Sequence, residues 1–313
     1  MTLRSPQLRS HLALLLCNII WACDYPFYNL VLGRYIAPEA MVCGSLIVAA
    51  LLSLAPMAWE PRERVERSDL LTIAIAALMI GVLRKVLLME GLSRTSPIDG
   101  SIIGTIGPLV VLLVSVAAGI DRLSGRKIVG LLLGGAGAVA VVLTGASTVH
   151  VKSQLGGNVM LLGGSCVTAL YMVFFKRLVA KYRVTTLLRL IYCFSAVVML
   201  PFGLPSLLRT DFSTMSPHIL LAALFVLCVP TYLPNLLLNF SLRYVAPTIS
   251  STYAYIQPVL AIALSVAMGL DRLHADTLVA AAVIFVGVGL VISSYGRPSS
   301  QPPHSSSQPL QQQ

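Results

Sequence analysis

The sequence predicts an all-α integral membrane protein of ten transmembrane helices, arranged as two inverted five-helix repeats. Three observations lead to this fold class. Of the 313 residues, 57% are hydrophobic and only 11% are charged, whereas soluble domains carry about 25% charged residues. The chain divides into apolar runs of about 20 residues, the length of a membrane-spanning helix. It also contains an internal duplication.

The apolar runs are separated by prolines and by short charged connectors, which mark where each span is expected to end. The final segment is rich in Ser, Gln and Pro, so residues 297–313 are expected to form a disordered polar tail. The ten expected spans are residues 11–32, 38–58, 69–90, 97–119, 126–145, 155–179, 186–206, 216–240, 247–269 and 275–295.

The duplication relates residues 92–141 to residues 242–291 without a gap, at an offset of 150 positions. Fifteen of the fifty aligned positions are identical, including two prolines and the run Asp-Arg-Leu that begins at Asp121 and at Asp271. The sequence therefore predicts one repeat in residues 1–150 and a second in residues 151–296. Because each repeat has an odd number of spans, the second enters the membrane in the opposite orientation, an arrangement typical of secondary transporters.

The distribution of lysine and arginine predicts the orientation. Fourteen of these residues fall on the side of the membrane that holds the termini, and five fall on the other side. Loops rich in lysine and arginine remain in the cytoplasm. We therefore expect a multi-pass protein of the cell inner (cytoplasmic) membrane with both termini in the cytoplasm.

The most informative charged residues inside the expected spans are Asp24, Arg84 and Lys85. A charge at the centre of a membrane helix costs roughly 2.5–3.5 kcal/mol on insertion scales, so such residues usually have a function. Counted along their helices, Asp24 and Arg84 lie at similar depths. Three interpretations stay open: a buried ion pair that fixes helix register, a site for substrate or a proton, and cations that extend toward the outer interface.

The first span carries a stripe of polar and aromatic residues at helical spacing, Cys17, Trp21, Asp24 and Tyr28. Residues at this spacing share one face of a helix. An interfacial aromatic belt is the alternative, but Trp21 lies too deep in the span for that. The stripe therefore favours the wall of a polar cavity.

The repeat offset places Arg84 and Lys85 opposite Pro234 and Asn235 of the second repeat. Two cations in one repeat thus correspond to a helix breaker and an amide in the other. Pro230 and Pro234 are expected to kink the eighth span and to free backbone carbonyl groups, either as a structural kink or beside a cavity.

The ninth span adds phenol and amide groups that can orient a ligand, in Tyr253 and Gln257. The alternative for both residues is hydrogen bonding between neighbouring helices. Gly130 and Gly134 permit close helix contact, either within the chain or in a homodimer.

The sequence contains none of the common enzyme signatures, and we expect neither a catalytic site nor a cofactor. Its six cysteines lie inside apolar segments without metal-ligand spacing, so we expect no metal site. The net charge of +10 reflects membrane topology, and no nucleic-acid partner is expected. The expected partners are the lipid bilayer and a small-molecule substrate.

Several segments match a known pattern: NIIWACDYPFYNLVLGRYIAP at residues 18–38, GLSRTSPIDGSIIGTIGPLVVLLVSVAAGIDRL at 91–123 and SLRYVAPTISSTYAYIQPVLAIALSVAMGLDRL at 241–273. In these segments the sequence resembles the EamA type of the drug/metabolite transporter superfamily. The resemblance implies ten helices, a central path lined by the fourth and ninth helices, and transport of small metabolites. Two features depart from the family pattern: Asp-Arg replaces Glu-Arg in the turn, and Arg84-Lys85 occupies a position where uncharged polar residues are expected.

The function expected from these features is secondary transport of a small polar metabolite, an amino acid or an organic anion, by alternating access. The residues expected to bind it are Trp21, Asp24, Tyr28, Arg84, Lys85, Asn235, Tyr253 and Gln257. The alternative is a non-transporting membrane protein, such as a lipid scramblase or a receptor subunit.

Overall fold

The computed structural model describes residues 6–94, 97–144, 155–257, 259–260 and 275–294. This part of the chain is almost entirely helical, which confirms the predicted all-α membrane fold. The longer helices are α1 (Pro6–Val31), α2 (Pro38–Leu54), α3 (Arg67–Ala76), α4 (Arg84–Arg94), α5 (Pro97–Ala117), α6 (Gly125–Thr144), α7 (Leu155–Phe174), α9 (Val184–Leu208), α10 (Pro217–Leu242) and α13 (Ala275–Ser293). The shorter ones are η1 (Ala55–Ala58), η2 (Ala77–Leu83), α8 (Lys176–Lys181), η3 (Phe212–Thr214), α11 (Pro247–Thr252) and η4 (Tyr253–Tyr255).

Within the described residues, five helices are long and apolar enough to cross a membrane, judged by length and composition, and two shorter apolar helices accompany them. Two expected boundaries differ from the structure by five residues. Helix α1 begins at Pro6, whereas the first span was expected to begin at residue 11. The sixth span was expected to reach residue 179, but α7 ends at Phe174, and Lys176–Lys181 forms the separate helix α8. The run of basic residues Lys176-Arg177 explains the break, because these side chains leave the apolar layer.

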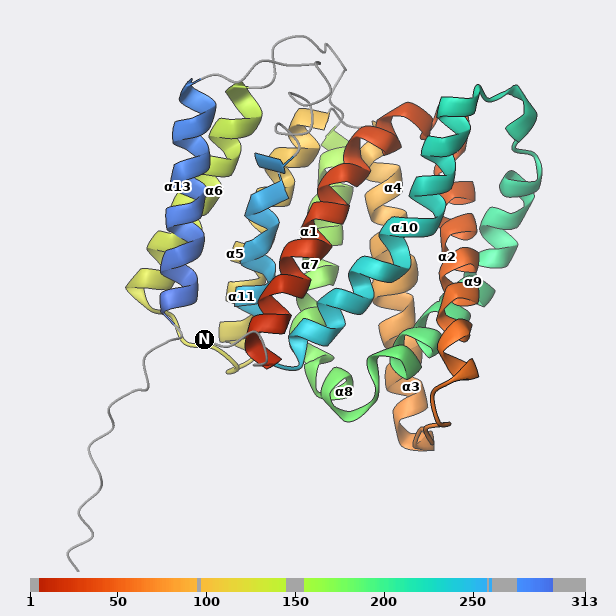
Figure 1. The fold of residues 1–313 in the computed structure, drawn as a ribbon, viewed down its shortest axis with the longest axis horizontal. Helices are drawn as coiled ribbons and strands as arrows, with labels where there is room; N and C mark the ends of the chain where they lie inside the picture. Colours follow the sequence, from red (N-terminus) through yellow and green to blue (C-terminus); the bar gives the residue numbers. More distant parts are fainter. Residues whose placement is uncertain (1–5, 95–96, 145–154, 258, 261–274, 295–313) are drawn as a thin grey trace, which may run out of the picture.

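The two repeats run in opposite directions across the molecule. In Figure 1, α1 starts at the lower end, whereas α7, the first helix of the second repeat, starts at the upper end; α13 ends at the lower end. We call this lower end, where α1 begins and α13 ends, the terminal face. Five helix pairs pack extensively between the repeats, namely α6 with α13, α2 with α9, α1 with α10, α4 with α7, and α5 with α7. The first four pairings are unchanged when the two repeats are exchanged, as a pseudo-two-fold axis requires.

The third span is continuous from Arg67 to Arg94 but contains the π-helical turn η2 just before Arg84. Gly81 lies in this turn, and a Cβ atom built there would come within 1.9 Å of Ser195 Oγ on α9. The Ser195 hydroxyl lies 3.0 Å from the carbonyl oxygen of Ala77. A polar side chain from a neighbouring helix is one of the features that stabilise such turns, which are frequent at functional sites.

Helices α6 and α13 approach so closely at their glycines that the backbones are in direct contact. A Cβ atom built at Gly287 would lie 2.5 Å from the Gly134 nitrogen and 2.6 Å from the Gly130 oxygen. Two interpretations of Gly130 and Gly134 were open, and the structure shows the first of them, close helix contact within the chain. Glycine allows this approach because it has no side chain between the two helices.

Candidate functional site

A cavity of about 190 Å³ lies between the two repeats. Its wall comes from α1, α4 and α5 of the first repeat and from α7, α10 and α11 of the second. Leu88, Leu161 and Met172 are among its apolar lining residues. The polar and aromatic side chains that line it are Asn18, Trp21, Tyr28, Arg84, Lys85, Ser165, Thr168, Thr231, Asn235, Ser250, Ser251 and Gln257.

The two cations of the third span both line this cavity, and each has hydrogen-bond partners on neighbouring helices. Arg84 donates from Nε to Thr168 Oγ1 at 3.1 Å, and its guanidinium lies 5.7 Å from the centre of the Trp21 ring. A cation over an aromatic face is stabilised by the ring quadrupole. The remaining guanidinium nitrogens can still donate to an anionic group, and their planar fork suits a carboxylate.

Lys85 is more deeply buried than Arg84, with 6% of its surface exposed. Its ammonium donates to Thr231 Oγ1 on α10 at 2.5 Å and to Ser45 Oγ on α2. Helices of both repeats therefore hold this cation in place. Together, Arg84 and Lys85 place two cationic side chains on the wall of the cavity.

The kinked helix α10 forms the wall facing these cations. Pro234 has no N–H, so the carbonyl of Pro230, four residues earlier, loses its helical partner. The indole Nε1 of Trp21 donates to that carbonyl at 3.2 Å. Trp21 thus satisfies a backbone group that the kink frees while it also borders the cavity.

A chain of hydrogen bonds continues along α10. Asn235 donates to the Thr231 carbonyl at 2.7 Å, and Asn239 donates to the Asn235 carbonyl at 2.8 Å. Tyr171 of α7 donates to Asn239 Oδ1 at 2.7 Å. These bonds fix the polar side of α10 so that Asn235 faces the cavity.

Six of the eight residues expected to bind substrate line the cavity: Trp21, Tyr28, Arg84, Lys85, Asn235 and Gln257. Tyr253 is not among the lining residues, and its hydroxyl lies 2.7 Å from Nδ1 of His11 on α1. This contact matches the alternative that was open for Tyr253, a bond between helices. The side chain of Asp24 lies outside the described residues, so its pairing with either cation stays a prediction.

Sequence reasoning missed several lining residues. Asn18 accepts a hydrogen bond of 2.8 Å from Gln257 Nε2 and so joins α1 to the second repeat. It precedes Trp21 by three positions, so the same helical spacing identifies it. Ser165 and Thr168 of α7, also three positions apart, are a similar signal in an otherwise apolar helix.

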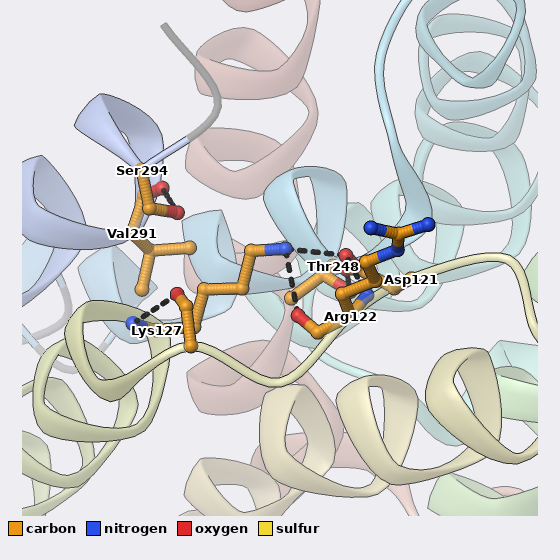
Figure 2. Close-up of polar contacts among 7 residues, drawn as sticks. Asp121, Arg122, Lys127, Thr248, Val291 and Ser294 are labelled. Atoms are coloured by element: carbon orange, nitrogen blue, oxygen red, sulfur yellow. Dashed lines mark hydrogen bonds and ion pairs between the residues drawn. The ribbon is translucent and has the colours of Figure 1, made fainter. Parts of the chain in front are cut away.

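A buried ion pair lies on the terminal face of the molecule (Figure 2). Lys127, at the start of α6, pairs with Asp121 in the turn after α5, and both side chains are 8% exposed. Thr248, in the first turn of α11, donates to the other carboxylate oxygen of Asp121 at 2.9 Å. This contact links the repeats where α5 and α11 approach each other. The repeat offset places the uncharged residues Ile98 and Thr277 at the positions equivalent to Thr248 and Lys127.

A second group of polar contacts joins the repeats on the same face. Lys181 lies 2.7 Å from carboxylate oxygens of both Asp69 and Glu66. Hydrogen bonds to these two carboxylates raise the pKa of Lys181 above its usual value. Thr185 donates to Glu60 Oε2 at 2.6 Å. The loop between α2 and α3 is thus attached to the connection between α8 and α9.

Comparisons with known proteins agree with this architecture. Residues 8–143 and 155–293 each match the model of the EamA-like transporter family. An uncharacterized transporter of Archaeoglobus fulgidus is 23% identical over 252 residues, which cover 80% of this chain and 86% of the relative. The uncharacterized transporter YyaM of Bacillus subtilis is 21% identical over 259 residues, covering 81% and 84%.

A solved crystal structure has the same fold. It superposes with a TM-score of 0.73 at 16% identity and covers 93% of this chain and all of that one. The match of the family model to both repeats spans most of the sequence and coincides with the two inverted halves. The chain is a multi-pass membrane protein that belongs to the EamA-like transporter family.

Proposed function

We propose that the protein is a secondary carrier that moves a small polar metabolite with an anionic group, an amino acid or an organic anion, across the membrane. The observation that supports this most directly is the placement of Arg84 and Lys85 at a cavity between the repeats. Lys85 is buried and Arg84 is partly buried, and an anionic ligand would bring a complementary charge to both side chains when it binds.

The remaining walls of the cavity suit the rest of such a ligand. Asn235 and Gln257 offer amide groups, while Leu88 and Leu161 offer apolar surface. Arg84 would bind the anionic group of the ligand, and Lys85 would neutralise it further. Most of the ligand would be enclosed, as is usual for small-molecule sites.

The mechanism that we propose is alternating access. The wall of the cavity comes from both repeats, and the polar contacts on the terminal face join one repeat to the other. If those contacts broke while the end of the molecule opposite the terminal face closed, the cavity would open to the side of the membrane on which the terminal face lies. In the proposed orientation, the terminal face lies in the cytoplasm and the protein resides in the cell inner membrane.

Uptake into proteoliposomes tests this proposal, with a panel of radiolabelled amino acids and organic anions as probes. For any compound that the wild type transports, Arg84→Ala is expected to lower uptake by about tenfold or more, because a hydrogen bond to a charged group contributes about 1.5–3 kcal/mol. Arg94→Ala is the matched control, since Arg94 lies on the same helix but pairs with Glu90 at the surface.

Equal uptake by Arg84→Ala and the wild type would remove the anion-binding role. Transport restricted to lipids, with no soluble compound moved, would favour a scramblase instead.

A further inference from the structure

One polar group beside the cavity is left without a partner. Ser250, on α11, is 3% exposed and lines the cavity, and its hydroxyl makes no hydrogen bond within the described part of the chain. Its neighbours Ser251 and Thr252 behave differently, because both donate to the Thr248 carbonyl, at 3.0 Å and 2.6 Å. A buried hydroxyl without a partner costs about 1–3 kcal/mol, so this exception requires an explanation.

The cavity supplies that explanation. Two other buried hydroxyls are also without partners among the described residues, those of Ser115 and Tyr232, but neither residue lines the cavity. Ser250 alone of the three faces a space that a ligand can enter. A ligand that bonded to it would satisfy a group that the protein leaves unsatisfied.

The wall that α5 contributes leaves room for such a ligand. Gly104 and Gly107 both line the cavity, and a Cβ atom built at either one would meet no atom within 4 Å. Packing therefore does not require glycine at these two positions, unlike Gly287. The equivalent positions in the second repeat carry side chains, Ala254 and Gln257. The α5 wall of the cavity thus lacks side chains at two positions, and α5 packs against α11, which carries Ser250.

We propose that Ser250 is a second ligand-binding residue and that it bonds to a polar group of the ligand other than its anion. The proposal rests on the proposed function, because the anion is assigned to Arg84 and Lys85. Those cations lie on α4, whereas Ser250 lies on α11, so the ligand is held from both repeats. The ligand class is accordingly a carboxylate with a second hydrogen-bonding group, and a plain aliphatic carboxylate fits less well.

Matched pairs of ligands test this inference, with butyrate and 4-hydroxybutyrate as one pair and butyrate and 2-aminobutyrate as another. Affinities are measured by titration calorimetry on the purified full-length wild type, Ser250→Ala, Ser115→Ala and Arg84→Ala. We expect the wild type to bind at least one substituted ligand more tightly than butyrate. Ser250→Ala should reduce that preference about threefold to tenfold, the effect of one hydrogen bond. Ser115→Ala removes a hydroxyl that has no partner among the described residues and does not line the cavity, so it should leave the preference for the substituted ligand unchanged.

The thermal stability of the ligand-free variants distinguishes binding from a structural role. Because the Ser250 hydroxyl has no partner within the described residues, Ser250→Ala should melt at the same temperature as the wild type or higher. A lower melting temperature, or an unchanged preference for the substituted ligand, would overturn the assignment of Ser250.

The pattern across variants separates this inference from the proposed function. If Arg84→Ala loses carboxylate binding and Ser250→Ala has no effect, the proposed function stands and the proposed contact between Ser250 and the ligand is rejected. Failure of every carboxylate to bind the wild type would reject both.

Discussion

Replacing Lys127 by methionine is expected to destabilise the folded protein by about 3–5 kcal/mol, the usual effect of removing one partner of a buried ion pair. The methionine keeps the length of the side chain and removes its charge. Asp121 would then remain buried, because its side chain is only 8% exposed. It would retain the hydrogen bond from Thr248 and another from the Arg122 backbone nitrogen, which favours the lower end of that range.

Arg94→Met is the matched control, since it also removes a cation from an ion pair. Arg94 pairs with Glu90 one helical turn away, and the Arg94 side chain is 48% exposed. Exposed pairs of this kind contribute about 0.2–1 kcal/mol. The two substitutions should therefore differ by about 2–4 kcal/mol, although each removes a single cation.

Thermal unfolding in detergent, followed by circular dichroism, measures the difference. A double variant, Lys127→Met with Asp121→Asn, should be more stable than Lys127→Met alone, because the amide removes the buried negative charge that has lost its lysine. If Lys127→Met is no less stable than Arg94→Met, the Lys127–Asp121 pair does not stabilise the terminal face, and the reasoning fails.

Two further substitutions test the packing and the cavity. Gly287→Ala should lower the free energy of unfolding by about 1–3 kcal/mol, because the added methyl group would overlap the backbone of Gly130 and Gly134. Gly289→Ala is the control in the same unfolding assay. It should have little effect, because a Cβ atom at Gly289 meets no atom within 4 Å. Gly107→Val should abolish uptake into proteoliposomes while the melting temperature stays within a few degrees of the wild type, because Gly107 lines the cavity and a Cβ atom there meets no atom within 4 Å. Gly289→Val is the control, and normal uptake by Gly107→Val would contradict the assignment of the cavity.

The fold was largely predictable because its main signals are local or periodic. Apolar runs set the spans, and the offset of 150 residues set the relation between repeats. The π-helical turn before Arg84 was not predicted, and its contact with Ser195 involves a residue more than a hundred positions away. The early end of α7 was missed for a related reason, because apolar residues continue beyond it into α8.

The candidate site was predictable where a charged or aromatic residue interrupts an apolar helix. Arg84, Lys85 and Trp21 were identified in this way, and all three line the cavity. Small residues interrupt an apolar helix less visibly, so the local composition does not separate Gly107, which borders the cavity, from Gly287, which is a packing residue. The partner of Tyr253 on α1 was also hidden, because it depends on how the two repeats pack together.

The ion pair of Lys127 and Asp121 has a consequence for the cycle of the proposed carrier. Ile98 and Thr277 occupy the inversion-related positions, so closing the opposite end cannot form the same lysine–aspartate bond. The two end states of the cycle would then differ in free energy, and about 1.4 kcal/mol of difference gives a tenfold bias in occupancy. An empty carrier would rest mainly with its binding site turned away from the terminal face, and that bias would decide from which compartment it loads first.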